Sequence, residues 1–182
     1  GVLAGDPQSA LVLAPRWGGA PPPDVPLRIA SRAGVDLNPL DPSNPADRVR
    51  LLSYVWPDQP ERLARMRAAL AIAGQSAVQI DAGDAADFVE RHAVPTAGMA
   101  TVVMHSIAFQ YFPADTQARI AAQLGSAGAT ATADAPLAWL RYEMSDPANP
   151  SFPELRLTLW PGGRDRLLAV GHAHGASIGW RA

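Results

Sequence analysis

Residues Ala100–Met104 read ATVVM, an unbroken apolar run whose length is typical of a β-strand. Strands of a parallel sheet that is covered on both faces have this composition, because neither side of the strand meets water. We therefore predict a central parallel strand here. His105 and Ser106 follow it directly, and Gln110 and Tyr111 lie in the loop beyond. Ligands of open α/β sheets bind beyond the carboxyl ends of strands, so this segment is also a candidate site.

The segments that flank this strand predict helices. Upstream, Asp84 has the side chain of a helix N-cap, and we expect a short helix from about Ala85 to His92. Downstream, Pro113 suits the first turn of another helix, where its missing N–H costs no hydrogen bond, and Gly125 suits its end. Helices on both sides of an apolar strand indicate an alternation of the two element types.

A longer helix is expected further upstream. Asp58 and Glu61 have the spacing of a capping box, and apolar residues then recur at three- and four-residue steps as far as Gly74. The stretch before it, Leu51–Trp56, fits either a strand or a helical turn, and its periodicity does not separate the two.

The remaining apolar stretches, each bounded by turn residues, predict strands. Three are expected as separate strands and two as a hairpin: Leu27–Ala30, Ala77–Ile80 and Pro136–Tyr142, then Leu155–Trp160 with Arg166–Val170. This order predicts an α/β fold of the Rossmann-like, three-layer class, with a mostly parallel sheet and a C-terminal antiparallel hairpin. Residues 1–26 are expected to be irregular, and residues 27–182 to form a single domain.

Composition excludes several classes of chemistry. The chain of 182 residues has no cysteine, and all 15 of its basic residues are arginine, which excludes disulfides, thiolate catalysis and a lysine Schiff base. The formal net charge of −2 argues against a nucleic-acid or membrane partner. No apolar run approaches a membrane span. We expect a soluble, cytoplasmic protein with a small-molecule ligand, and the oligomeric state stays open.

Several phrases together resemble an uncharacterised bacterial family, catalogued as domain of unknown function 2332. The resemblance spans nearly the whole chain and implies no known activity. The phrases are RAGVDLNPLD (residues 32–41), LSYVWPDQ (52–59), HSIAFQY (105–111), APLAWLRYE (135–143), LTLWPGG (157–163) and HAHGASIGW (172–180).

More distantly, the order of elements is similar to that of class I methyltransferases that use S-adenosylmethionine. This resemblance implies that Asp36 meets the ribose hydroxyls, that Asp84 lies beside the adenine, and that substrate-facing residues lie in Val102–Pro113. The glycine-rich loop of that superfamily has no counterpart in Gly1–Pro26, and we expect it upstream of Gly1. The pocket of this chain alone would then be incomplete.

Each candidate residue also has an ordinary structural interpretation. Asp36 organises the turn before Pro39 if it does not bind ribose, and Asp84 caps a helix if it does not meet adenine. His105 is a candidate general base, with Tyr111 as a second catalytic candidate, but a hydrogen-bonded structural histidine is equally consistent with its position.

Trp56 and Gln110 are candidates for substrate binding, although Trp56 also suits a role in packing. His172 and His174 would share a face if they lie on a strand, but no third metal ligand is evident nearby. We therefore predict no metal site and keep a metal-dependent hydrolase only as an alternative that metal analysis would test.

Two functions are consistent with these observations. The first is a methyltransferase-like protein that binds S-adenosylmethionine when full length, because methyl transfer needs alignment more than acid–base groups. The second is a non-catalytic binding or scaffold module with a degenerate Rossmann-like fold. Whether the protein is an enzyme is left open.

Overall fold

The structure is a computed structural model, and it describes residues 5–23, 25–75, 78–145 and 152–181. The chain divides into two compact units. Unit 1 comprises Gly1–Leu13 and Pro23–Asp84, and unit 2 comprises Ala14–Pro22 and Ala85–Ala182. The expectation of a single domain over residues 27–182 stays a prediction.

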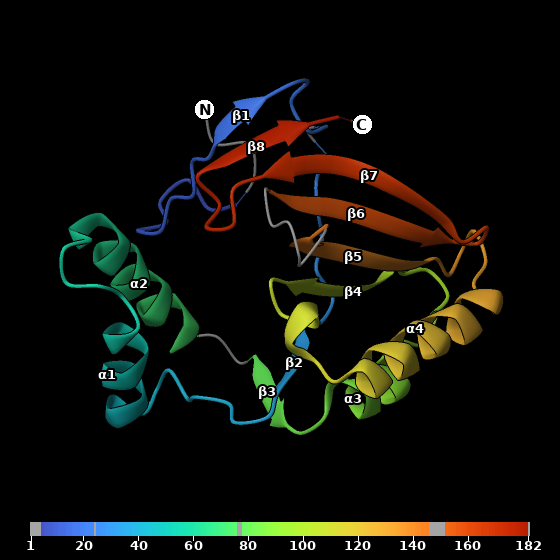
Figure 1. Cartoon of the computed structure of the whole chain (residues 1–182), viewed down its shortest axis with the longest axis horizontal. Helices are drawn as coiled ribbons and strands as arrows, with labels where there is room; N and C mark the ends of the chain where they lie inside the picture. The colour runs from blue at the N-terminus through green and yellow to red at the C-terminus, as the bar shows by residue number, and fades with distance from the viewer. Residues whose placement is uncertain (1–4, 24, 76–77, 146–151, 182) are drawn as a thin grey trace. The chain divides into compact units, whose positions relative to one another are not determined.

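Unit 1 has two parallel strands joined through two helices, a βαβ arrangement (Figure 1). Strand β2 (Ala33–Asp36) pairs with β3 (Gln79–Ala82), and helices α1 (Pro45–Ser53) and α2 (Pro60–Ala73) lie between them along the chain. The strand predicted at Leu27–Ala30 is wrong, because regular pairing begins only at Ala33.

Local capping chemistry sets the bounds of α1 and α2. The side chain of Asn44 accepts a hydrogen bond from the Ala46 N–H at 2.8 Å and so begins α1, which resolves the start of Leu51–Trp56 as helix. Helix α2 ends at the predicted Gly74, but its N-cap is Gln59, without a side-chain bond. The predicted capping box at Asp58 and Glu61 is therefore wrong.

Unit 2 has a six-stranded sheet with the order β1-β8-β7-β6-β5-β4 (Figure 1). The strands, in this spatial order, are Arg16–Gly18, Ser177–Trp180, Arg164–Gly171, Pro153–Trp160, Leu137–Met144 and Thr101–Ser106. Helix α3 (Ala85–His92) packs against α4 (Ala114–Ala129), and α4 contacts β5 and β6. The expected α3 helix and the β6–β7 hairpin are confirmed.

The direction of the strands corrects one part of the prediction. Among the described residues, β1–β8 and β4–β5 pair in parallel, whereas β5–β6, β6–β7 and β7–β8 pair antiparallel. The sheet of unit 2 is therefore not mostly parallel. Short connections are the physical reason, since parallel neighbours need a long crossover and a few residues such as Pro161–Gly163 allow only an antiparallel return.

Strand β4 also differs from its prediction as a central strand covered on both faces. It is the end strand of the sheet in unit 2, and exposure alternates along it. Val102 and Met104 are 55 % and 63 % exposed, while Val103 packs against the buried cluster. The apolar run therefore predicted the strand correctly but its burial on both faces wrongly. When both faces of a strand are apolar, the sequence pattern does not show which face is buried.

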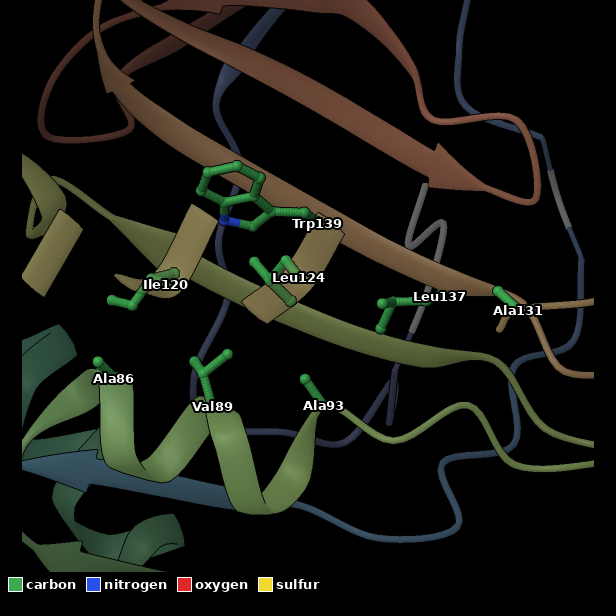
Figure 2. Packing of buried hydrophobic residues seen from close by; sticks show 8 residues of the cluster. All are labelled: Ala86, Val89, Ala93, Ile120, Leu124, Ala131, Leu137 and Trp139. Atoms are coloured by element: carbon green, nitrogen blue, oxygen red, sulfur yellow. The ribbon is translucent and has the colours of Figure 1, made fainter. Parts of the chain in front are cut away.

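The core of unit 2 lies between the two helices and β5 (Figure 2). Leu124 of α4 and Leu137 of β5 are fully buried, and each such leucine contributes about 1.5–3 kcal/mol relative to exposure. Gly128 allows α4 to approach Trp160 closely, because an added Cβ would lie 2.5 Å from the ring of Trp160. The cluster comprises Ala86, Val89, Ala93, Ile120, Leu124, Ala131, Leu137 and Trp139.

Among the described residues, no helix is long and apolar enough to cross a membrane.

Candidate functional site

Unit 1 contains an open hollow of about 490 Å³ at the end of β2. A carboxylate, an amide, a guanidinium, a phenol and aliphatic side chains all reach it. The lining residues are Asp36, Asn38, Pro39, Leu40, Arg50, Leu51, Tyr54 and Ile80. Asp36 is the last residue of β2, which is where ligands of α/β sheets bind.

One carboxylate oxygen of Asp36 stabilises a turn, and the other is available to accept hydrogen bonds. Its Oδ1 accepts a hydrogen bond from the Asn38 N–H at 2.8 Å, so the predicted role in the turn before Pro39 is confirmed. Its Oδ2 makes no hydrogen bond to any residue that the structure describes. That second oxygen faces water or a ligand, and its role toward ribose stays a prediction.

Arg50 and Tyr54 complete the polar part of the hollow, and sequence reasoning missed both. The Arg50 Nε donates to the Tyr54 hydroxyl at 3.0 Å, which holds one against the other across a turn of α1. They are four residues apart, the spacing at which helix side chains meet, and this was the available signal.

Two other candidates of unit 1 do not line this hollow. Trp56 is 70 % exposed, in the segment between α1 and α2, so a role for it in packing is not observed. Asp84 lies two residues beyond the end of β3. Of the three candidates in this unit, the hollow therefore includes Asp36 alone, and the roles of Asp84 and Trp56 stay predictions.

In unit 2, His105 at the end of β4 is enclosed by protein groups. Its Nδ1 lies 2.7 Å from Glu143 Oε1, and its Nε2 accepts a hydrogen bond from the Trp139 indole N–H at 2.9 Å. Its ring stacks on Phe109, with ring centroids 4.8 Å apart. Because indole is only a donor, Nε2 must carry the lone pair and the proton must be on Nδ1.

This arrangement fixes His105 as a neutral ring that donates to Glu143. A catalytic base needs a free nitrogen, so His105 can act as one only after its bond to Trp139 is given up. The predicted catalytic role stays a prediction. The structural alternative was a ring bonded to backbone, whereas the hydrogen-bond partners of the His105 ring are two side chains.

Glu143 organises the loop that follows β4. Its Oε1 also accepts from the backbone N–H groups of Ala108, at 3.1 Å, and Phe109, at 3.2 Å. Burial raises the pKa of Glu143, but the hydrogen bonds from His105 and from these two N–H groups outweigh it and hold the pKa below its ordinary value of 4.5. The carboxylate is therefore ionised at neutral pH.

Ile107, inside this loop, has an unusual backbone conformation. Its φ is +48°, in the left-handed region that a β-branched residue rarely adopts. Such residues persist only where surrounding contacts determine the conformation, and they concentrate at ligand clamps and active sites. Here the hydrogen bonds that the N–H groups of Ala108 and Phe109 donate to Glu143 supply that constraint.

Gln110 and Tyr111 lie in a short 3₁₀ helix, Phe109–Tyr111, just beyond the strained residue. Tyr111 is 73 % exposed. The Oε1 of Gln110 is buried and has no hydrogen-bond partner among the described residues. Both candidates therefore lie in the segment that directly follows His105 and β4. Their functional roles stay predictions.

Beside His105 a second hollow, of about 380 Å³, opens on the sheet of unit 2. Sequence reasoning missed most of its charged residues, which come from β5 and β6. The lining residues are His105, Phe109, Trp139, Arg141, Glu143, Met144, Ser145, Glu154 and Arg156. Alternation along the two strands, which places these charges on one face, was the signal that could have found them.

His172 and His174 lie in the turn between β7 and β8, and not on one strand. Their ring centroids are 5.7 Å apart, and the backbone N–H of His174 donates to the Nδ1 of His172 at 3.1 Å. No group of three metal-ligating side chains occurs in the described part of the chain.

A bacterial family described as "Uncharacterized protein conserved in bacteria (DUF2332)" matches residues 1–180. The chain belongs to this family. No curated protein and no solved structure matches it. The function of the family is not known, so a functional assignment depends on the two hollows.

Proposed function

We propose that this protein has a methyltransferase-like, Rossmann-like fold and that unit 1 binds the adenosine part of S-adenosylmethionine. The observation that carries this proposal is the position of Asp36, at the carboxyl end of a parallel strand and on the wall of the hollow. Two parallel βαβ arrangements support the fold: β2 to β3 through α1 and α2, and β4 to β5 through α4.

The lining of the hollow suits a nucleoside. The free Oδ2 of Asp36 is an acceptor for ribose hydroxyls, and Leu40, Leu51 and Ile80 offer apolar surface to a base. Tyr54 adds an aromatic ring. The groups that line the hollow suit the adenosine part, and we restrict the proposal to that part. When bound, S-adenosylmethionine supplies a methyl group for transfer.

Calorimetry of the 182-residue chain tests this proposal with adenosine, S-adenosylmethionine and the two deoxyadenosines. Adenosine and S-adenosylmethionine should bind with similar affinity, because both present the same half to unit 1. Loss of one ribose hydroxyl should weaken binding by about tenfold, the effect of a hydrogen bond to a charged group. Absence of binding by both ligands at millimolar concentration would overturn the proposal.

A matched pair of variants separates a bound ribose from general charge. Asp36→Asn keeps an oxygen for the Asn38 N–H but removes the carboxylate, so adenosine should bind about tenfold more weakly. Asp58→Asn removes an exposed carboxylate that does not line the hollow and should change nothing. Equal effects of the two substitutions would contradict a role for Asp36.

The alternative, a binding module without chemistry, is favoured by one observation. Both ring nitrogens of His105 are occupied by protein groups. This alternative predicts that adenosine binds while methyl transfer to any acceptor is absent from the full-length protein. Methyl transfer itself needs mainly alignment, so an enclosed histidine does not count decisively against the enzyme.

A further inference from the structure

The hollow of unit 2 carries a second inference, which is independent of the nucleoside proposal. Its charged residues form two cross-strand pairs on one face of the sheet. Arg141 lies opposite Arg156, and two positions further along, Glu143 lies opposite Glu154. Like charges that face each other directly are unfavourable unless another group neutralises them.

The arginine pair is bridged by one carboxylate of the protein. Asp165 of β7 bonds to both Arg141 and Arg156. Burial raises the pKa of Asp165, but its bonds to Arg156 and the charge of Arg141 outweigh this and lower the pKa, so the bridging carboxylate is ionised at neutral pH.

The glutamate pair is less well compensated. Arg156 donates to one oxygen of Glu154 at 2.9 Å, but it makes no bond to Glu143. The histidine beside Glu143 contacts only Oε1 through its Nδ1, and its Nε2 is occupied by the indole N–H of Trp139. The Oε2 of Glu143 is buried and has no partner among the described residues. The negative charge of the two facing carboxylates is therefore only partly compensated within the described part of the chain.

Arg141 provides the opposite kind of group on the same wall. Its guanidinium lies 4.3 Å from the centre of the Trp139 ring and uses only Nη2 for its bonds to Thr158 and Asp165. Its Nη1 makes no hydrogen bond in the described part of the chain, and its Nε is buried and likewise has no partner there. Arg141 therefore keeps its Nη1 as a donor for a ligand carboxylate.

We infer that this hollow binds a small zwitterion of the α-amino acid class, with its ammonium between Glu143 and Glu154 and its carboxylate at Arg141. The two arginines and two glutamates of the lining cancel in charge, which disfavours a polyphosphate or a polyamine. The Cα atoms of residues two apart on a strand are about 6.6 Å apart, so Arg141 and Glu143 present opposite charges along one wall of the hollow.

Saturation-transfer NMR with each standard L-amino acid as the probe tests this inference on the 182-residue chain. At least one amino acid should receive transfer, and its affinity should fall by about tenfold or more when its amine is acetylated or its carboxylate is converted to an amide. If all amino acids are silent, or if the blocked derivatives bind equally well, the inference is wrong.

Variants then assign the two ends of the ligand. Glu143→Gln and Arg141→Gln should each weaken the best amino acid by about tenfold, while Arg166→Gln, an exposed arginine on β7 that does not line the hollow, serves as control. If Glu143→Gln fails to fold, Glu154→Gln tests the same end. Asp36→Asn should leave amino-acid binding unchanged, so this inference and the nucleoside proposal fail separately.

Discussion

The hydrogen bonds that shape the hollow of unit 1 join near neighbours in the sequence, whereas those that shape the hollow of unit 2 join residues far apart in the sequence. In unit 1, Asp36 bonds to Asn38, two residues away, and the turn is stabilised locally. In unit 2, one oxygen of Glu143 accepts bonds from His105, Ala108 and Phe109, which lie 38, 35 and 34 residues earlier. The first site depends on its own loop, and the second depends on the packing of two strands.

This difference predicts unequal tolerance to substitution. Removal of the Glu143 carboxylate leaves three part-buried donors unpaired, whereas removal of the Asp36 carboxylate leaves one exposed N–H, which water can reach. We therefore expect the loss of stability to decrease from substitutions at Glu143, through those at Ile107, to those at Asp36.

Glu143→Ala should have the largest effect. It removes the acceptor of three hydrogen bonds and leaves the ring N–H of His105 unpaired, with an expected loss of about 3 kcal/mol or more in the free energy of unfolding. Urea denaturation measures the loss. Glu143→Gln keeps an oxygen at this position and should retain most of the stability; equal losses in both variants would mean that these hydrogen bonds do not stabilise the loop.

The same carboxylate predicts how stability depends on pH. The pKa of Glu143 is lower in the folded than in the unfolded chain, so its contribution is present above the unfolded value of about 4.5 and is lost as pH falls through the folded value. We expect the urea midpoints of the native chain and of Glu143→Gln to converge as the pH is lowered from about 6. Parallel curves would contradict this linkage.

A third comparison tests the strain at Ile107. Alanine normally stabilises a chain relative to glycine, but a positive φ reverses the order, so Ile107→Gly should be more stable than Ile107→Ala by about 1 kcal/mol. Both changes remove the same side chain beyond Cβ, which isolates the backbone term. Thermal and urea unfolding measure the difference, and a more stable alanine variant would show that the loop is not strained.

Asp36→Ala should have the smallest effect on stability. It removes one bond to an exposed backbone N–H, which water replaces, so we expect a loss of about 0.5 kcal/mol. Amide hydrogen exchange should increase at Asn38 while exchange in unit 2 stays unchanged. A loss as large as that of Glu143→Ala would remove the contrast between the two sites.

How well the sequence predicted each site depends on whether the interacting residues are neighbours in the chain. Asp36, with its turn before Pro39, was identified because turn chemistry involves neighbours only. His105 was singled out by its place after an apolar strand, but its partners Glu143 and Trp139 were not, since each belongs to a strand more than thirty residues later. Arg141 and Arg156 were not predicted as site residues, because charged side chains on a strand usually face water.

The sequence by itself determined the local elements. The family was identified from short phrases, and helix α3, the end of α2 at Gly74 and the hairpin of β6 and β7 result from capping and turn residues that act over a few positions. Only the tertiary structure decided that β4 is the end strand of the sheet in unit 2, and that one carboxylate of β5 holds the loop after it. The physical reason is that strand pairing and burial depend on which distant segments meet, and no local pattern records that choice.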